Sequence, residues 1–285
     1  EKFDNNDVFQ YSIGNKKKDD HNNKNIKLYT INSMHILTDN LDKKIDADVF
    51  VVVSRHRAEG GRASLTTHPI GNFGKAGAGG KDNTLCISPA FLLKNVFSEL
   101  NKNVNGTEYE ATLESTHHGP YMEKPILYVE LGSNEKFWED KNGANIVAKS
   151  LMGALESFNN NNLTINNSSN NNGKNNNTPP NIDEKNNNSK SKSNEDNESV
   201  FVIGGSHYNH VANKTMLNTG YVVGHICPKH NLENFNENML KQAMEKIIPK
   251  PKFVLLDWKG LGKEKQRILG LLEKNNIKYE RSDKF

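Results

Sequence analysis

Short apolar runs alternate with segments of helical periodicity along most of this sequence, and few folds accommodate such an alternation. Runs typical of strands lie at residues 28–31, 34–37, 49–53, 108–114, 126–131, 200–203, 221–223, 253–256 and 277–280. Helical patterns lie at residues 89–100, 134–158, 236–248 and 263–274, and we expect Ser88 and Ser133 to cap the first two. Strands that alternate with helices of ten or more residues indicate an α/β fold with a mostly parallel sheet.

An asparagine-rich segment interrupts this pattern between Asn159 and Ser199. Eighteen of its forty-one residues are Asn, and apolar side chains are almost absent. Such a segment cannot bury enough surface to offset the entropy cost of ordering its chain. We therefore expect a disordered insert at 159–199, flanked by residues 1–158 and 200–285 as the two parts of one domain.

Charge and cysteine content exclude some classes of protein. The 37 basic and 34 acidic residues leave a net charge of +3, far from the strongly basic footprint of a dedicated nucleic-acid-binding domain. Two cysteines, Cys86 and Cys227, are too few for a disulfide framework, and we expect each to be buried and inert. No run approaches the roughly 18 apolar residues of a membrane span. We expect a soluble, cytoplasmic protein that does not enter a membrane.

Ten histidines are many for a chain of this length, and they concentrate near the ends of predicted strands. In a parallel sheet, residues just past the carboxyl ends of the strands line the usual ligand crevice. Neutral imidazoles there suit Zn²⁺, whereas isolated histidines in turns can simply cap backbone groups. No HExxH motif is present, so the spacing does not say which histidines share an ion. The candidates are His56, His68, His117, His118, His207 and His225, with Glu130 as the best-placed carboxylate.

The adjacent pair His117 and His118 would point to opposite faces of a regular strand. Both can serve one site only from a turn, and the sequence Ser115-Thr116-His117-His118-Gly119-Pro120 has the composition of a turn. We expect one of the two to act as ligand or base and the other to orient it.

A glycine-rich run from Gly71 to Asp82 allows close backbone approach to an anionic ligand, and Lys75 and Lys81 add positive charge. The run has neither the spacing of a Walker A loop nor that of a Rossmann fingerprint, which removes the main support for nucleotide-dependent transfer. A flexible loop without a ligand is the alternative. Trp258 follows a predicted strand and is a candidate for stacking on a nucleic-acid base, with core packing as its alternative.

Several short motifs occur together in one order. They are Ser54-Arg55-His56, Ser64 to Asn72 (SLTTHPIGN), Gly79-Gly80-Lys81-Asp82, Thr116-His117-His118-Gly119-Pro120, Glu130-Leu131-Gly132-Ser133, Gly204-Gly205-Ser206-His207-Tyr208, Gly224 to Lys229 (GHICPK) and Asp257-Trp258-Lys259-Gly260. This set resembles the zinc-dependent D-aminoacyl-tRNA deacylases of archaea and plants. The resemblance spans about Asp46 to Lys278, without the insert.

The resemblance implies a three-layer α/β/α fold with a mostly parallel mixed sheet, akin to nucleoside phosphorylases and peptidyl-tRNA hydrolases, in a single catalytic domain. It implies zinc, two ions per subunit, and hydrolysis of the ester that joins a D-amino acid to the 3′ end of tRNA by a monomer. We assign catalytic roles to His117, His118, His207 and Glu130. We assign metal ligation to His56, His68, His117, His207 and His225, and the grip on the tRNA 3′ end to Gly71, Asn72, Lys75, Lys81, Lys229, Trp258 and Lys259.

The chain departs from the family pattern at a few points. Asn209-His210 stands where family members have Ala-Pro, and His230 stands where they have Tyr, so these two histidines are weak ligand candidates. Family members also begin with a further strand and helix, which we expect this chain to lack. The asparagine-rich insert has no counterpart in the family.

Two other functions fit parts of the pattern. A peptidyl-tRNA hydrolase or nucleoside phosphorylase of the same fold would share the glycine-rich anion site and the strand-end histidines, but it would not need zinc. A non-catalytic tRNA-binding module would bind charged and uncharged tRNA alike and would release no amino acid.

Overall fold

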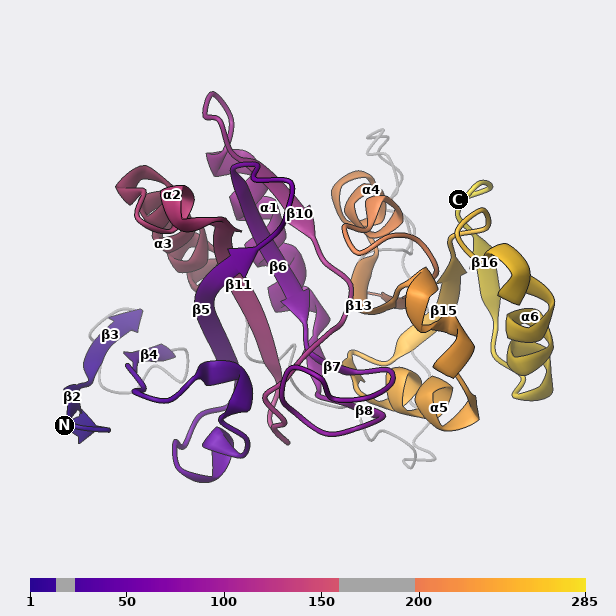
Figure 1. The fold of residues 1–285 in the computed structure, drawn as a ribbon, viewed down its shortest axis with the longest axis horizontal. Coiled ribbons are helices and arrows are strands. Elements are labelled where there is room, and N and C mark those ends of the chain that lie inside the picture. Colours follow the sequence, from indigo (N-terminus) through magenta and orange to yellow (C-terminus); the bar gives the residue numbers. More distant parts are fainter. Residues whose placement is uncertain (14–23, 159–197) are drawn as a thin grey trace, which may run out of the picture.

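The computed structural model describes residues 1–13, 24–158 and 198–285. All but the last two residues of the expected disordered insert, 159–199, therefore lie outside the described residues. Two four-stranded sheets form the centre of the fold, the first before this segment and the second after it (Figure 1).

The first sheet is mixed and has the strand order β10-β6-β11-β5. Its strands are β5 (Phe50–Arg57), β6 (Ser64–Pro69), β10 (Glu110–Leu113) and β11 (Ile126–Ser133). β11 runs parallel to β5 and antiparallel to β6, and β10 runs parallel to β6. β5 lies at the edge of this sheet, which leaves its Val53 52% exposed.

The second sheet is entirely parallel and has the order β13-β12-β15-β16. Its strands are β12 (Ser199–Ile203), β13 (Val222–Cys227), β15 (Pro251–Leu256) and β16 (Tyr279–Arg281). The central strands are buried, which explains why they appear in the sequence as continuous apolar runs rather than as alternating ones.

Helices pack against both sheets, and α1 (Ala90–Asn103) joins them because it contacts β6, β10 and β13. Its buried residues, among them Leu93, Val96, Phe97 and Leu100, recur at the spacing of one helix face. α3 (Lys141–Ser157) packs along α1, and α4 (His210–Asn218) contacts β10 and β13. The other helices are α2 (Glu135–Trp138), α5 (Glu237–Glu245) and α6 (Lys265–Lys274).

Short elements complete the fold. The two-residue strands β9 and β14 pair in parallel and tie the two parts of the sequence together. The remaining pairs are β1 (Lys2–Phe3) with β2 (Asn6–Asp7), β3 (Phe9–Ile13) with β4 (Lys24–Leu28), β7 (Gly71–Asn72) with β8 (Thr84–Leu85), and β9 (Ser88–Pro89) with β14 (Ile247–Ile248). The described part of the chain also contains the 3₁₀ turns η1 (His35–Leu37), η2 (Leu41–Lys43), η4 (Lys229–Asn234) and η5 (Gly262–Glu264).

The segment after β10 crosses from the first sheet to the second. Glu114 forms an isolated β-bridge with Tyr208. The Ser115 N–H donates to the His207 carbonyl over 2.8 Å, and the Thr116 N–H donates to the Ile226 carbonyl over 2.9 Å. This segment therefore lies across the carboxyl ends of β12 and β13, and its backbone bonds fix which side chains of the two sheets meet.

Most expected elements are present, and the errors have local causes. The run 34–37 forms the turn η1 instead of a strand, and only Leu28 of the run 28–31 belongs to a strand. The helix expected at 134–158 is divided into α2 and α3, because the Asp140 side chain accepts two backbone N–H groups and starts a new helix. Ser88 lies in β9, and Pro89 takes the N-cap position of α1 without a side-chain cap.

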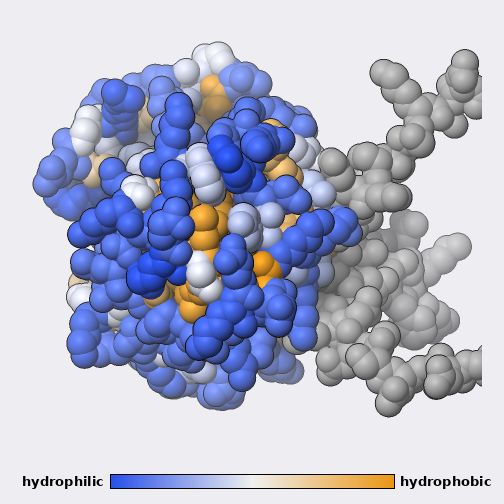
Figure 2. All heavy atoms as spheres, turned by 90° about the vertical axis from the view of Figure 1, so that its right-hand side faces the viewer, coloured by the Kyte–Doolittle hydropathy of each residue, from blue (hydrophilic) through white to orange (hydrophobic). Residues whose placement is uncertain are grey.

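The face that α6 turns outward is hydrophilic over most of its area, and hydrophobic residues gather in a strip near its centre (Figure 2). Among the described residues, no helix combines the length and the apolar character that crossing a membrane requires.

The position of Phe97 predicts a large contribution to stability. Its side chain is fully buried in the core between α1 and the sheets, so Phe97→Ala should lower the free energy of unfolding by about 3–5 kcal/mol. The control is Phe9→Ala, whose side chain is 64% exposed and whose removal should change the same quantity by less than about 0.5 kcal/mol. Denaturant unfolding of both variants tests this, and equal losses would contradict the packing.

Candidate metal and catalytic site

Imidazoles and carboxylates from separate segments of the chain gather where the two sheets meet. β5 supplies one histidine, β6 another, β11 a glutamate, the segment after β10 a glutamate and two histidines, and the loop after β12 a histidine. We call this set the histidine–glutamate cluster; its members are His56, His68, Glu114, His117, His118, Glu130 and His207.

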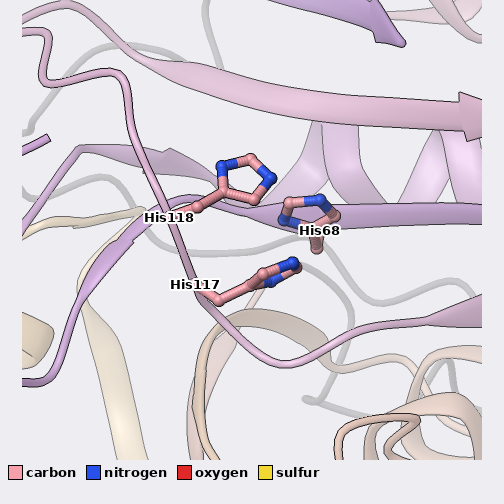
Figure 3. Close-up of side chains that lie close together, drawn as sticks. All are labelled: His68, His117 and His118. Atoms are coloured by element: carbon pink, nitrogen blue, oxygen red, sulfur yellow. The ribbon is translucent and has the colours of Figure 1, made fainter. Parts of the chain in front are cut away.

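Three imidazoles of the cluster face one another (Figure 3). The ring centre of His68 lies 4.3 Å from that of His117 and 5.0 Å from that of His118, and one ligand atom from each of the three lies within 4.8 Å of the others. His118 has a positive φ of 46°, which turns its ring to the same side as that of His117. The side chains of His117 and His118, although adjacent in sequence, thus both reach the site around His68 because their backbone forms a turn.

The hydrogen bonds of these rings determine which nitrogen is free. The Nδ1 atoms of His68, His117 and His118 donate to the carbonyls of Pro69 (3.1 Å), Ser115 (2.7 Å) and Gly119 (2.6 Å). Because a carbonyl only accepts, each Nδ1 carries a hydrogen, and in the neutral ring Nε2 keeps its lone pair. Histidines that bind metal ions in proteins are oriented by the same kind of bond to a carbonyl.

Glu114 connects the two sides of the cluster. Its side chain is fully buried, and its Oε2 lies 2.8 Å from His207 Nε2 and 3.6 Å from His117 Nε2. Its Oε1 lies 3.2 Å from His56 Nδ1, without the geometry of a hydrogen bond. Burial opposes ionisation, but the hydrogen bond from His207 and the surrounding imidazoles lower the pKa of Glu114 to about 2. The carboxylate is therefore ionised at neutral pH.

Glu130 occupies a similar position on β11. Its Oε2 lies 3.4 Å from His56 Nδ1 and 3.7 Å from His68 Nε2. Burial again opposes ionisation, but the neighbouring imidazoles hold the pKa of Glu130 well below its usual value. The cluster thus contains two buried carboxylates that interact with the same histidine.

The two carboxylates divide the imidazoles into two electrostatic groups. Burial lowers the pKa values of His117 and His118, to about 4 for His118, so both rings are neutral at neutral pH. For His56 and His68 burial acts in the same direction, but interaction with Glu130 and Glu114 outweighs it and raises their pKa values. Neutral imidazoles are the form that binds metal ions.

His56 is fixed from two further directions. Its Nε2 and the Tyr208 hydroxyl form a 2.6 Å hydrogen bond, which connects β5 with the loop after β12. Beneath the ring, a Cβ at Gly132 would stand 2.9 Å from His56 Cβ and Cδ2, so only glycine leaves room there. The Gly132 position, one of the motif residues, therefore shapes the cluster.

The cluster fits a divalent metal ion. His68 Nε2 and Glu114 Oε1 are buried and have no hydrogen-bond partner among the described residues, an arrangement that costs free energy unless something else binds them. Three groups bring together enough ligand atoms to hold an ion, and several imidazoles with one or two carboxylates are typical zinc donors. The groups are His68, His117 and His118; Glu114, His117 and His207; and His56, Glu114 and Glu130.

The structure does not bring His225, which the sequence suggested as a ligand, into the cluster. The ring is fully buried, its Nε2 donates to the Cys86 carbonyl over 2.9 Å, and its Nδ1 lies 3.1 Å from the Thr116 hydroxyl. Both nitrogens are thus engaged in bonds that hold β13 to its neighbours. The weaker candidates His210 and His230 are exposed and also lie outside the cluster.

The glycine-rich run from Gly71 to Asp82 forms a loop that hydrogen bonds and close packing hold in one conformation. Asn72 donates from Nδ2 to the carbonyls of Gly79 and Lys81, and a Cβ at Gly71 would stand 2.5 Å from Leu85 Cα. These contacts are internal, so Gly71 and Asn72 hold the loop in shape rather than facing solvent. Lys75 pairs with Asp82, which compensates its charge.

The loop nevertheless lies beside the cluster, because Gly80 packs against Gly119, the residue after His118. Lys81 is exposed and sits 3.6 Å above the Tyr121 ring. Lys229 and Lys259 are also exposed.

Trp258 and the two cysteines pack against or within the core of the protein. Trp258 is half-buried against the core of the second sheet, and its ring contacts Lys265 and Arg281. Cys86 and Cys227 are buried, as expected, and burial raises the pKa of Cys86 to about 11 and that of Cys227 well above its usual value. Neither thiol is a nucleophile at neutral pH.

Sequence reasoning missed Glu114 and Tyr208. Glu114 closes the predicted strand 108–114 and therefore carried the same strand-end signal as the histidines. Tyr208 follows His207 directly, but nothing in the sequence indicates that its hydroxyl reaches a histidine 152 residues away.

The close contact at Gly132 predicts that adding one methyl group there destabilises the protein, whereas adding one at an uncrowded glycine does not. Gly132→Ala should lower the free energy of unfolding by about 1–3 kcal/mol, because the new Cβ overlaps His56. Gly270→Ala inside α6 is the matched control: apart from the backbone of its own helix, nothing would lie within 4 Å of the new Cβ, so it should raise stability by up to about 1 kcal/mol. Denaturant titrations measure both, and a neutral Gly132→Ala would refute the tight fit.

Comparisons with known proteins identify the family of this chain. The model of the D-aminoacyl-tRNA deacylase family matches residues 43–280. A D-aminoacyl-tRNA deacylase of Cenarchaeum symbiosum is 31% identical over 254 residues, which cover 88% of this chain and 84% of the relative. One of Thermococcus kodakarensis is 27% identical over 287 residues, which cover 98% and 88%.

A solved structure supports the fold. The crystal structure of a conserved protein of unknown function, AF0625, matches with a TM-score of 0.71 at 23% identity and covers 98% of this chain and 87% of that one. The family match begins before β5 and ends in β16, so it includes every residue of the histidine–glutamate cluster. The chain belongs to the D-aminoacyl-tRNA deacylase family.

Proposed function

We propose that this protein hydrolyses the ester between a D-amino acid and the 3′ end of tRNA, which releases a free D-amino acid and a reusable tRNA. The observation that carries the proposal is the buried Glu114 carboxylate paired with the partly exposed His207, next to three imidazoles whose Nε2 atoms are available. The names of the archaeal relatives point to the same reaction.

Zinc is the metal that we propose for the cluster. His68, His117 and His118 would hold one ion through Nε2, and His56, Glu114 and Glu130 are the best candidates for a second. When bound, zinc polarises the ester carbonyl and lowers the pKa of a water molecule toward neutrality.

His207 is the proposed general base. Its Nε2 hydrogen donates to Glu114, which leaves Nδ1 as the atom that can accept a proton, and its side chain is 38% exposed toward solvent. As water adds to the carbonyl carbon, Nδ1 takes the water proton; as the ester C–O bond breaks, the same proton passes to the departing ribose oxygen. Glu114 keeps the ring oriented and stabilises its charged form between these two steps.

The remaining parts of the proposal concern the whole molecule. We propose a three-layer α/β/α arrangement of the phosphorylase type, in which residues 1–158 and 200–285 form one catalytic domain interrupted by the insert. The protein would act as a monomer in the cytoplasm, where charged tRNA is found. The exposed Lys81, Lys229 and Lys259 would contact the tRNA 3′ end.

The direct test is release of amino acid from D-tyrosyl-tRNA and L-tyrosyl-tRNA, side by side, with a chelator and with zinc restored. We expect hydrolysis of the D-ester alone, loss of activity with the chelator and recovery with zinc. His117→Ala and His207→Ala should each abolish turnover, whereas His210→Ala, an exposed histidine outside the cluster, should not. Hydrolysis that persists in the chelator would favour a metal-independent enzyme of the same fold, and binding of tRNA without hydrolysis would favour a binding module.

The Tyr208 bond to His56 predicts a smaller effect. Tyr208→Phe removes the hydroxyl that fixes His56 beside both carboxylates, so we expect the single-turnover rate or the zinc affinity to fall about 10- to 100-fold. Tyr279→Phe on β16, an edge strand of the second sheet that contributes no residue to the cluster, is the control and should behave like the unchanged protein. An unaltered rate together with unaltered zinc affinity in Tyr208→Phe would show that the bond is dispensable.

A further inference from the structure

Two arginines stack on one tryptophan beside the histidine–glutamate cluster. The guanidinium carbon of Arg55 lies 5.0 Å from the centre of the Trp138 ring, and that of Arg57 lies 4.8 Å from it. Both distances are within the range of a cation–π contact, which restricts each guanidinium while its N–H groups can still donate to an anion. The arrangement is thus a pair of pre-oriented cationic donors on the protein surface.

The position of the ring is set by the cluster itself. Trp138 Nε1 donates to the main-chain carbonyl of His56 over 2.8 Å, while the side chain of the same His56 contacts both buried carboxylates. The indole therefore cannot shift along β5 without breaking a bond to a cluster residue. The arginines and the cluster are held in one rigid relation.

The two features lie on opposite faces of one edge strand. Arg55, His56 and Arg57 are consecutive in β5, so the arginines project to the face opposite that of His56. The burial of the strand has the same alternation, since Arg55 and Arg57 are exposed and His56 is buried. Because β5 is the edge of its sheet, an extended ligand that ends at the cluster can pass over this edge and reach both arginines.

The arginines have little competition for an anion. Arg55 forms no salt bridge within the described parts of the chain, and the Glu135 carboxylate interacts with it only at longer range. Arg57 pairs with Glu135, but both side chains are more than 65% exposed, and such surface pairs contribute little free energy. A phosphate can therefore bind Arg55 directly and replace Glu135 at Arg57.

We propose that Arg55, Arg57 and Trp138 form a phosphate subsite for the single-stranded 3′ end of tRNA. Arginine donors that form a planar fork bind phosphate through paired hydrogen bonds, and RNA supplies one phosphate per nucleotide. The subsite rests on the proposed function, since that function places the 3′ terminal ester at the cluster. It holds the nucleotides before the ester and takes no part in bond cleavage.

The test measures binding of uncharged tRNA over a series of salt concentrations, together with single-turnover hydrolysis of D-tyrosyl-tRNA at saturating enzyme. Arg55→Gln should weaken tRNA binding about tenfold and make the salt dependence shallower by about 0.7, and the single-turnover rate at saturating enzyme should fall by a smaller factor than the affinity. Arg55→Lys keeps the charge but loses the fork, so it should retain the salt dependence and still bind more weakly.

A second variant is expected to strengthen tRNA binding instead of weakening it. Glu135→Gln removes the carboxylate that competes for Arg57, so it should tighten tRNA binding two- to threefold, on the order expected for one exposed ion pair. Lys149→Gln, which removes an exposed charge from α3, is the matched control and should change binding little.

The outcomes separate this subsite from the proposed reaction. Hydrolysis by the unchanged protein with normal tRNA binding by Arg55→Gln would overturn the subsite and leave the reaction intact. Weaker and less salt-dependent binding by Arg55→Gln would support the subsite even if D-tyrosyl-tRNA were not cleaved. An equal loss in Lys149→Gln, or no tRNA binding by the unchanged protein, would also overturn the subsite.

Discussion

The buried charge of Glu114 is the interaction on which the rest of the site depends. A carboxylate without exposed surface is stable only if positive or hydrogen-bonding groups surround it, and here histidines from β5, from the loop after β12 and from its own segment do so. Each of these histidines comes from a different part of the chain. The two sheets are therefore joined by electrostatics at the site as well as by the core around α1.

The backbone makes this convergence possible. Ser115 and Thr116 donate backbone hydrogen bonds to the loop after β12 and to β13, so the Glu114 carboxylate arrives at the second sheet in a fixed register. The turn that follows brings His117 and His118 back toward His68, with left-handed backbone at His118. Small residues remove the remaining obstacles, since Gly132 leaves space for His56 and Gly80 for the turn at Gly119.

The same contacts separate residues that shape the site from residues that can meet a substrate. His56, His68 and Glu130 are all buried, and they contact one another. His207 and His117 are partly exposed, with 38% and 30% of their side chains open to solvent. This difference in exposure is the reason for giving the proton-transfer role to His207.

The sequence by itself determined the α/β class, most of the strands and helices, and six of the seven members of the histidine–glutamate cluster, because apolar periodicity and strand-end polar residues are local signals. It predicted a strand at 34–37, where the structure has the turn η1, and one helix at 134–158, where the structure has two. It also could not exclude His225 or find Tyr208. Only the tertiary structure decided those points. Whether an imidazole nitrogen is free depends on the carbonyl or hydroxyl that stands opposite it, and for His225 and His56 those partners lie more than one hundred residues away in the chain.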